Sequence, residues 1–421
     1  MGMARSSYLF FVEITATLLL LIYPTLMLVV KGGMNGIFLF MLLIALAVRL
    51  VRPTSLNTVA WRCEWTIYAL AMAAMSAAIL ISQSYHQNYS AHSYDAASRY
   101  WLAIPIFLLL QRLPLNVFTV LPLAFPIAAI MGFILAKNLG GGVLGIGTLD
   151  QIHFGDFELI LGIMSLFSID WFGRDKFLFR ALKILGFIAG LVTSIASGSR
   201  GGWLAMPIFI AFFFYFKMPR VTLKILMIRI FMGILCLTIL ISLSTTFNHR
   251  VTQLANDVAT FDQGNRDTST GIRWQLYKAA VDVFLHHPVF GVGPEGFALE
   301  MEPMVKAGKI TPVAAELGRG EVHNDILSKA AGMGIFGLIA MLAIYLVPFR
   351  LFWQATKSAS NQVKSAGLLG ITFVSGFFVF GLTVEFLNLT MATAFYGFTV
   401  AVLLAACHNI YIYHDAHITA R

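Results

Sequence analysis

The sequence predicts an all-α integral membrane protein with about 12 transmembrane helices and one large helical loop outside the membrane. Three observations predict this fold class. Of the 421 residues, 58% are hydrophobic and only 12% are charged, whereas about a quarter of the residues of a soluble domain are charged. Apolar runs of spanning length recur along the whole chain. One long polar stretch, residues 248–323, interrupts them late in the sequence.

Each apolar run is interpreted as one transmembrane span, because a spanning helix needs about 20 mostly apolar residues. The first run is longer than the apolar core of a signal peptide, so we interpret it as a retained span. The fourth and fifth spans are separated by a tight loop that contains Arg112 and Pro114. The predicted spans are 8–30, 34–50, 64–83, 99–112, 114–136, 156–173, 178–198, 201–217, 222–247, 324–349, 366–386 and 390–413.

Basic residues are distributed unevenly between alternate short loops. Cytoplasmic loops of membrane proteins carry an excess of lysine and arginine, so the richer set of loops is predicted to be cytoplasmic together with both termini. The poorer set contains only Lys31, Arg99, Lys137 and Arg200. The richer set contains Arg49, Arg52, Arg62, Arg112, Arg174, Lys176, Arg180, Lys183, Lys217, Arg220, Lys224, Arg229, Arg350, Lys357 and Lys364.

This orientation divides the chain into three parts. Residues 1–247 carry spans 1–9, residues 248–323 form the loop outside the membrane, and residues 324–421 carry spans 10–12 and a short cytoplasmic tail. Within the loop, apolar residues at helical spacing predict an amphipathic helix from residue 273, with its apolar face at the level of the lipid headgroups. Pro288 ends it, and a second short helix is predicted across 297–308. The apolar stripe consists of Trp274, Tyr277, Val281, Phe284 and Leu285.

Several classes of site are disfavoured by the composition. The net charge of +9 is explained by membrane orientation, so no nucleic acid partner is expected. The three cysteines show no Cys-x-x-Cys or Cys/His ligand spacing, so no metal site is expected. The glycine pattern at 291, 293 and 296 follows a predicted helix rather than a strand, and we interpret it as a turn rather than as a dinucleotide site.

Three residues of the outer segments have the chemistry of a catalytic site for an anionic substrate. Arg200 lies among glycines and serines between spans seven and eight, and Arg273 opens the amphipathic helix. Arginine binds phosphate through two parallel hydrogen bonds, so these two residues could hold a pyrophosphate without a metal ion. The start of span eight would add helix N-terminal N–H groups. His323, at the start of span ten, is suited to proton transfer at neutral pH.

Each of these three residues also has an ordinary structural interpretation. Arg200 could anchor a span end at the interface, Arg273 could orient its helix at the headgroups, and His323 could be a satisfied polar residue. Their occurrence together on one side of the membrane favours the catalytic interpretation. Further substrate-binding candidates on that side are Asp95, Arg99, Arg266, Arg319 and Asn324.

Local patterns give these further candidates alternative roles. Asp95 and Arg99, four residues apart, could pair on a helix surface or line the mouth of a cavity. Asn324 and Asp325 are predicted as N-cap residues of span ten, and Asp156 as the N-cap of span six.

The motifs around these residues resemble the O-antigen ligase family, within a wider group that includes O-antigen polymerases and protein O-oligosaccharyltransferases. The resemblance covers most of the chain. It rests on Ser197-Gly198-Ser199-Arg200-Gly201-Gly202-Trp203, on Gly271-Ile272-Arg273-Trp274 continuing to Pro288, Gly291 and Gly293, on His323-Asn324 followed by Gly332, Gly334 and Gly337, and on Asp95 with Ser98-Arg99.

The resemblance implies a function at the periplasmic face of the bacterial inner membrane. The donor would be O-antigen linked to undecaprenyl pyrophosphate, and the acceptor a sugar hydroxyl of the lipid A–core oligosaccharide. Arg200 and Arg273 match the two essential arginines of the family, and His323 matches its essential histidine. No cofactor and no metal are implied, because the leaving group is a lipid pyrophosphate.

The residues themselves fit an inverting transfer, because no paired carboxylate stands out as a covalent nucleophile. Three alternatives stay open. A polymerase or a protein O-oligosaccharyltransferase would use the same donor with a different acceptor. A transporter of anionic solutes would place charges near the middle of broken helices. A structural scaffold would leave Arg200 and His323 without a role.

Overall fold

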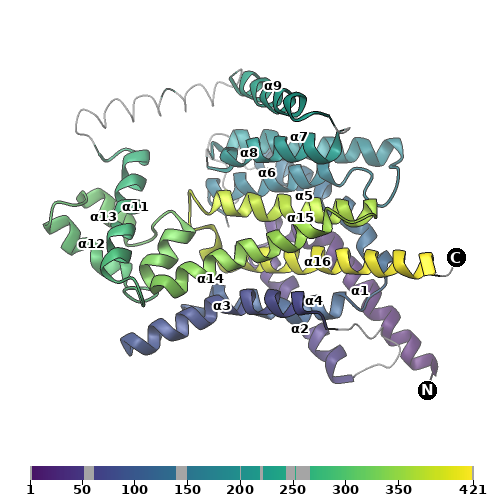
Figure 1. The fold of residues 1–421 in the computed structure, drawn as a ribbon, viewed down its shortest axis with the longest axis horizontal. Helices are drawn as coiled ribbons and strands as arrows, with labels where there is room; N and C mark the ends of the chain where they lie inside the picture. Colours follow the sequence, from purple (N-terminus) through teal and green to yellow (C-terminus); the bar gives the residue numbers. More distant parts are fainter. Residues whose placement is uncertain are drawn as a thin grey trace.

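The computed structural model describes residues 2–51, 61–138, 149–199, 201–218, 221–242, 252 and 266–419. Within these ranges the chain forms helices joined by turns, and they contain no β-strand. Long helices form one bundle, and three short helices form a cap at one end of it (Figure 1). The all-α membrane fold that the composition predicts is therefore confirmed.

The bundle is built from two groups of helices that are separated in sequence by the cap. The first group comprises α1 Gly2–Val29, α2 Gly33–Val51, α3 Cys63–His86, α4 Tyr94–Leu110, η1 Leu115–Val120, α5 Leu121–Asn138, α6 Gln151–Phe167, α7 Phe177–Ser197, η2 Gly202–Ala205, α8 Met206–Phe212, η3 Phe213–Lys217 and α9 Leu223–Ser242. The second group comprises α14 Asp325–Ala355, α15 Asn361–Phe380, η4 Phe386–Asn388 and α16 Thr390–Thr419. The cap consists of α11 Ser269–His286, α12 Phe297–Lys306 and α13 Pro312–Gly318.

Each of the twelve predicted spans contains helix in the structure. Among the described residues, eight helices are long and apolar enough to cross a membrane: α1, α2, α3, η1 with α5, α7, α14, α15 and α16. The other predicted spans correspond to α4 and α6, of 17 residues each, to the shorter apolar segment Gly202–Lys217, and to α9. The chain is therefore a multi-pass membrane protein.

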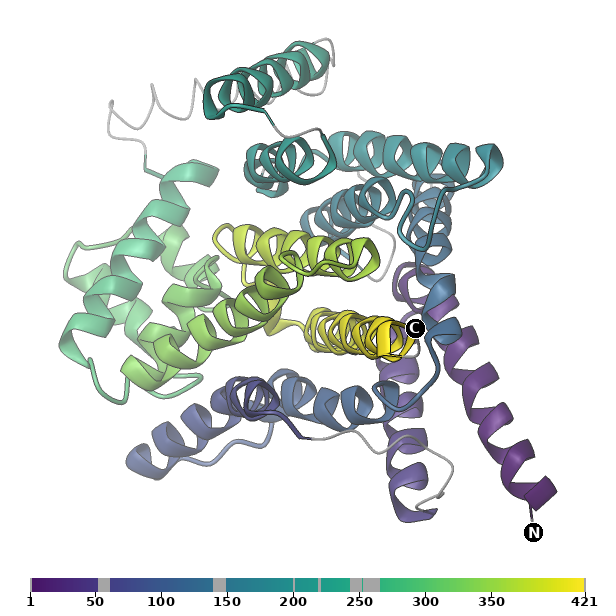
Figure 2. The ribbon, with the colours of Figure 1, turned by 45° about the vertical axis from the view of Figure 1, so that its right-hand side comes forward.

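The helices of the second group form the centre of the bundle. The spanning windows of α15 and α16 are 83% and 89% buried inside the protein, and neighbouring helices surround them (Figure 2). Peripheral helices instead expose large apolar side chains, for example Phe177 at 87% and Leu223 at 73%. Side chains of this kind on the outside of a bundle suit contact with lipid.

Span eight differs from the prediction of one regular helix. The 3-10 turn η2, the seven-residue α8 and the π-helical turn η3 follow one another along it. Pro207, near the start of α8, has no N–H to donate to the preceding turn, which favours a helix that begins there. The first helical turn after residue 200 is therefore the 3-10 turn that starts at Gly202, and the regular α-helix begins at Met206. That its N–H groups bind an anion stays a prediction.

The two ends of the bundle carry different loops. The turns at 87–93 and 381–389, and residues 198, 199 and 201, lie at the end occupied by the cap. The turns at 111–114, 168–176 and 356–360 lie at the opposite end. The first residues of α1 and the last residues of α16 also lie opposite to the cap (Figure 1). Successive loops thus alternate between the two ends of the bundle, in the order that the distribution of basic residues predicts.

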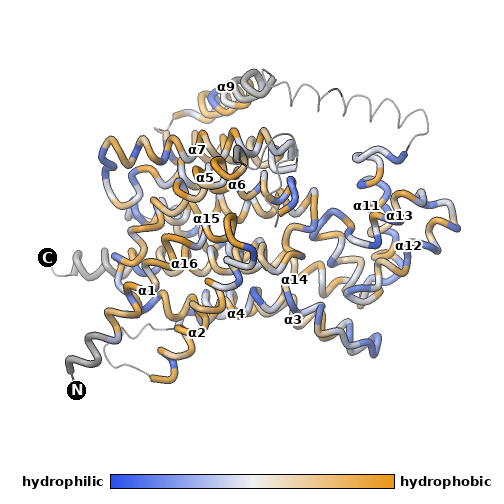
Figure 3. Tube along the Cα trace, turned by 180° about the vertical axis from the view of Figure 1, so that it is seen from behind, coloured by the Kyte–Doolittle hydropathy of each residue, from blue (hydrophilic) through white to orange (hydrophobic). Residues whose placement is uncertain are grey.

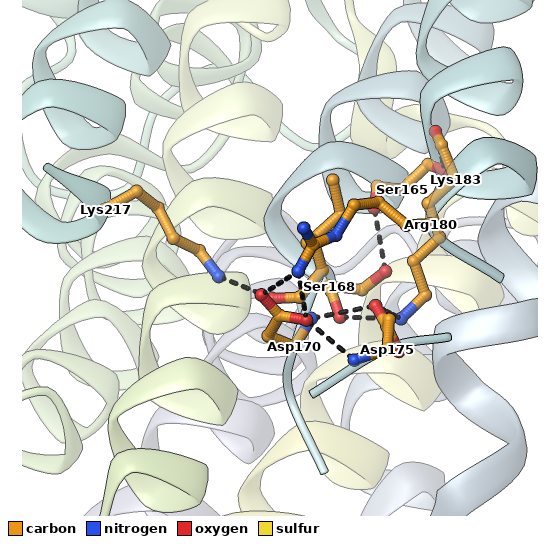
Figure 4. A network of polar contacts seen from close by, with 8 residues as sticks. Ser165, Ser168, Asp170, Asp175, Arg180, Lys183 and Lys217 are labelled. Atoms are coloured by element: carbon orange, nitrogen blue, oxygen red, sulfur yellow. Dashed lines mark hydrogen bonds and ion pairs between the residues drawn. The ribbon is translucent and has the colours of Figure 1, made fainter. Parts of the chain in front are cut away.

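A buried polar network stabilises the end opposite to the cap (Figure 4). Lys183 is 2% exposed, and its ammonium group donates to Asp175 Oδ2 at 2.7 Å and to the Ser168 carbonyl at 3.0 Å. Arg180 donates to both carboxylate oxygens of Asp170, at 2.9 and 2.7 Å. Lys217 donates to the Ile169 carbonyl at 2.9 Å. These three basic residues, all predicted to be cytoplasmic, thus bind the turn at 168–175.

Removing the partner of the buried lysine is expected to destabilise this end of the bundle. The Asp175→Asn variant leaves the Lys183 charge without its carboxylate, a change that typically costs about 3 kcal/mol or more in a buried pair. Its thermal unfolding in detergent should therefore shift down by several degrees. The matched control is Glu316→Gln, which breaks the half-exposed pair with Arg319 and should cost less than about 1 kcal/mol. Equal midpoints for the two variants would contradict the role of this network.

The cap has a small hydrophobic core of its own. Buried residues of its three helices pack together and against the start of α14; they include Ile272, Leu276, Ala280, Met301, Ala314 and Val322. The cap is more hydrophilic than the bundle (Figure 3). The predicted helices at 273–285 and 297–308 are confirmed as α11 and α12, whereas α13 was not predicted.

The face of α11 that packs on the protein differs from its most apolar stripe. Within the predicted stripe, Trp274, Val281 and Leu285 are 51%, 41% and 68% exposed. The buried face instead carries Ile272, Leu276 and Val283 together with Ala279 and Ala280, and α11 packs against α14. The exposed stripe is compatible with the headgroup level, but it is not the face that holds the helix in place.

The glycine-rich segment after α11 is a turn that lies on α14. The N–H groups of Val292 and Gly293 donate to the carbonyls of Ala331 and Gly332, at 3.1 and 2.9 Å. Gly291 has a φ of +66°, and a Cβ there would overlap the backbone of Gly332. At Gly334 the backbone of α14 leaves helical geometry. This close backbone contact supports the interpretation of the pattern as a turn and fixes the cap to span ten.

Candidate active site

His323 lies on a strained turn between the cap and α14. Its φ is +61°, a left-handed conformation that is uncommon for residues other than glycine, although histidine and asparagine tolerate it better than most. Asn324 follows as the N-cap of α14, and its side chain accepts a hydrogen bond from Leu327 N at 3.0 Å. The N-cap role predicted for Asn324 is confirmed. A strained residue next to a helix start is retained only where surrounding contacts hold it.

Tyr277 of α11 provides one of these contacts. Its hydroxyl group lies 3.0 Å from the carbonyl oxygen of His323 and 2.8 Å from that of Leu382, so its one proton is shared between these two acceptors. Asn324 also donates to the Leu382 carbonyl, at 3.1 Å. Burial raises the pKa of Tyr277, although the nearby Arg273 acts in the opposite direction. The hydroxyl therefore remains a donor at neutral pH and joins the cap to the loop between α15 and α16.

Glu385, in that same loop, provides the second contact. Its side chain is buried, with Oε1 accepting from Val322 N at 2.5 Å and Oε2 from the Ser328 hydroxyl at 2.9 Å. The ammonium group of Lys329 lies 3.9 Å from Oε2. Hydrogen bonds to a charged carboxylate are stronger than neutral ones. Glu385 thus fixes the residue directly before His323.

Glu321 contacts the imidazole ring itself, through Oε1 and Nδ1 of His323. The two side chains are 30% and 17% exposed. Burial disfavours the charged form of Glu321, but its contact with His323 and the nearby His153 outweigh that effect, and the pKa of Glu321 is lowered from its ordinary value. The carboxylate is therefore ionised at neutral pH. A carboxylate on Nδ1 orients the ring and leaves Nε2 for a substrate.

Replacing Glu385 with alanine is expected to lower the activity of the protein about tenfold or more without unfolding it, because Val322 loses its acceptor and His323 loses its fixed position. The comparison variant is Ser328→Ala, which removes only the bond to Oε2 and should have a smaller effect. Rates and unfolding midpoints of both variants would be measured in the same detergent. A Glu385→Ala variant as active as the wild type would exclude this positioning role.

Arg273 lies one helical turn before Tyr277, on the same side of α11. Its side chain is partly buried, and it makes no hydrogen bond or ion pair with the residues that the structure describes. Its charge acts on the Tyr277 hydroxyl, which bonds the His323 carbonyl. The structure therefore brings two of the three predicted catalytic residues to one corner of the cap and leaves the guanidinium group available for an anion.

Arg200 lies outside the described residues, but both of its neighbours are placed. The Ser199 hydroxyl donates to Asp156 Oδ1 at 2.8 Å, and both residues are buried. A Cβ at Gly201 would overlap Thr383 Oγ1. Thr383 directly follows Leu382, whose carbonyl accepts from Tyr277. Gly201, directly after position 200, thus lies against the same loop that holds the residues around His323, whereas Ser199 contacts α6.

Two predicted N-caps have other roles. Asp150, not Asp156, caps α6, because its side chain accepts from the N–H groups of Ile152 and His153. The helix therefore starts earlier than its apolar run, and Asp156 lies inside it, bonded to Ser199. Asp325 is fully buried and accepts from the Tyr345 hydroxyl at 2.9 Å rather than capping α14.

The remaining predicted binding residues are spread around the cap. Asp95 contacts His92 at 3.0 Å rather than Arg99, and Arg99 donates to Ser98 and Asn35, so the predicted pair between them is absent from the described contacts. Arg319 pairs with Glu316 at 3.2 Å.

Asp95 and Arg319 line a common cavity, whereas Arg99 does not line it. The side chain of Arg266 is exposed, and its carbonyl accepts from Gln275 at 2.8 Å. Of this predicted set, only Asn324 directly contacts the elements that hold His323.

Sequence reasoning missed three residues of this site, which are Tyr277, Glu321 and Glu385. Tyr277 was assigned to an apolar stripe, although its hydroxyl group needs a partner when buried. Glu385 lies at the end of an apolar run and has no local pattern around it. A signal for Glu385 was present, because an acidic side chain beside a span is costly unless it has a role.

The fold and the site together define a multi-pass all-α membrane protein with a capped polar site at one end of its bundle. The model of the O-antigen ligase family matches residues 185–342, a segment that contains positions 200, 273 and 323. The match supports the assignment of the chain to this family, and it indicates an enzyme of the glycosyltransferase type.

Two relatives are similar to this chain, and one of them is an O-antigen ligase. The chain is 26% identical over 144 residues to an O-antigen ligase of Escherichia coli, covering 33% of this chain and 34% of the relative. It is also 25% identical over 309 residues to an uncharacterised protein of Haemophilus influenzae, covering 72% of this chain and 76% of the relative.

Proposed function

We propose that this protein transfers O-antigen from undecaprenyl pyrophosphate to a sugar hydroxyl of the lipid A–core oligosaccharide, at the periplasmic face of the bacterial inner membrane. The observation that carries the proposal is the position of His323. It sits on a strained turn held by Tyr277 and Glu385, one hydrogen bond away from the helix that presents Arg273, which has no hydrogen bond or ion pair among the described residues. Strain maintained by contacts from several elements is a mark of functional sites.

The chemistry assigned to this corner is a direct displacement at the anomeric carbon. The acceptor oxygen forms a bond to that carbon while the bond to the pyrophosphate oxygen breaks, which inverts the centre. His323 accepts the acceptor proton at Nε2, and Glu321 stabilises the resulting imidazolium at Nδ1. Arg273 and Arg200 stabilise the charge that grows on the pyrophosphate.

The orientation follows from the distribution of charge. Basic residues concentrate in loops at the end of the bundle opposite to the cap, which the positive-inside rule assigns to the cytoplasm. Spans 1–9 within 1–247 and spans 10–12 within 324–421 would then leave both termini cytoplasmic. The 248–323 segment, with its cap, would face the periplasm.

The test is a transfer assay with purified protein in liposomes. Lipid-linked O-antigen is supplied with lipid A–core, with a second lipid-linked glycan, or with a pilin-like protein, and the products are separated by gel. We expect transfer to lipid A–core, and we expect it to persist in EDTA because no step requires a metal. Products only on the second glycan would instead identify a polymerase, and products only on the protein an oligosaccharyltransferase.

A further inference from the structure

A cavity of about 360 Å³ borders the site on Glu321 and Val322. It lies between the second half of α3, the start of α4, the start of α12, the end of α13, the start of α14 and the loop between α15 and α16. Its volume is within the range of small-molecule sites, about 300–1,000 Å³. His323 and Arg273 do not line it, so it is separate from the corner assigned to the pyrophosphate.

The charges that line this cavity are mainly negative. Four carboxylates face two cations, an excess of two negative charges, and the one lining histidine, His92, contacts a lining carboxylate. A diphosphate would be repelled here, whereas carboxylates readily accept hydrogen bonds from hydroxyl and ammonium groups. The four carboxylates are those of Asp95, Glu295, Glu321 and Glu385, and the cations are Arg319 and Lys329.

Two of these carboxylates keep oxygens that no described residue occupies. Asp95 uses Oδ2 for His92, which leaves Oδ1 available. Glu295 uses Oε1 for the hydroxyls of Ser90 and Ser93, which leaves Oε2 available. The cations are partly engaged, Lys329 by Asn388 and Arg319 by Glu316. The free carboxylate oxygens can therefore accept hydroxyl protons, and the remaining N–H groups of the two cations can donate to sugar oxygens.

We propose that this cavity binds the terminal sugar of the acceptor glycan, and that it selects a sugar that is neutral or carries an amine over one that is acidic or phosphorylated. The inference rests on the proposed glycosyl transfer. Glu321 supplies the connection, because it lines the cavity and contacts the ring of His323. A hydroxyl group held in the cavity is thus placed beside the base, while the charged donor is kept with the arginines.

The kinetic test uses Asp95→Asn with the full-length protein. Loss of a charged acceptor should raise the KM for lipid A–core about tenfold and leave the KM for the lipid-linked donor unchanged. Asp95→Asn should also narrow the preference for an acceptor ending in a neutral hexose over one ending in a uronic acid. The control is Glu302→Gln, an exposed acid of α12 that pairs with Lys306 outside the cavity. Altered donor KM, or no change in acceptor KM, would overturn the proposal.

A binding measurement separates this proposal from the proposed reaction. A deacylated core oligosaccharide with a neutral terminal hexose should bind the wild-type protein, as detected by saturation-transfer NMR, and the signal should weaken in Asp95→Asn but not in Glu302→Gln. If the protein shows this binding pattern but does not transfer glycan, the proposed transfer reaction is refuted and the assignment of the cavity to the acceptor sugar still holds. Absence of binding by the wild type, or tighter binding of the uronic acid form, would refute the cavity assignment.

Discussion

Replacing His323 with asparagine is expected to reduce glycan transfer by at least about 10²-fold, the usual contribution of a general base. Asparagine is the informative replacement because it tolerates the left-handed backbone that His323 adopts, φ +61°. Alanine would add backbone strain at the same position and confuse stability with chemistry. The measurement is the initial rate of transfer in liposomes, together with the amount of folded protein.

The matched control for this variant is His286→Asn. His286 lies at the end of α11, its side chain is 66% exposed, and it bonds the Asp282 carbonyl of its own helix. Its replacement should leave the rate within about twofold of wild type, as for most surface changes. If His323→Asn transferred glycan at the wild-type rate, a proton-transfer role for this residue would be excluded.

The second large effect is expected at Arg273. Lysine keeps the charge but loses the two parallel hydrogen bonds of the guanidinium, so Arg273→Lys should lower kcat/KM about tenfold or more. Arg273→Ala should lower it by about 10²–10³-fold, the range for loss of one donor to a developing negative charge. Both variants should fold normally, since Arg273 has no hydrogen bond or ion pair among the described residues.

Lys278 supplies the control for Arg273 within the same helix. It is exposed and lies over the ring of Trp274, 5.0 Å from the ring centre. Lys278→Ala removes one positive charge from α11 away from the turn that carries His323, so kcat/KM should change little. If Lys278→Ala and Arg273→Ala lost equal activity, the effect would reflect the overall charge of the helix rather than a specific contact with pyrophosphate.

The sequence predicted the helices well because apolar runs of spanning length leave few alternatives in lipid. His323 and Arg273 were selected because few other side chains on that side combine the required charge and proton chemistry, and their catalytic role stays a prediction. The sequence did not predict which face of α11 is buried. The apolar stripe with Trp274 was the stronger periodic signal, yet the face with Ile272, Leu276 and Val283 packs against the protein.

The supporting residues of the site could not be predicted, because their partners are distant in sequence. Val322 and Glu385 are 63 positions apart, and Tyr277 and Leu382 are 105 positions apart. No local pattern records such contacts, which exist only after the bundle has assembled. The predicted N-cap of α6 was wrong for a related reason. The helix begins after Asp150, before the apolar run from which its start was predicted.

The loop at 382–385 has a consequence for engineering this protein. Because Leu382 and Glu385 accept hydrogen bonds from the cap and from the turn before α14, the extramembrane helices are not an independent module. A chimera that exchanges residues 266–324 with those of a relative should work only when the 381–388 loop is transplanted with them. Grafting both segments together is therefore the way to keep these hydrogen bonds in a chimera of two relatives.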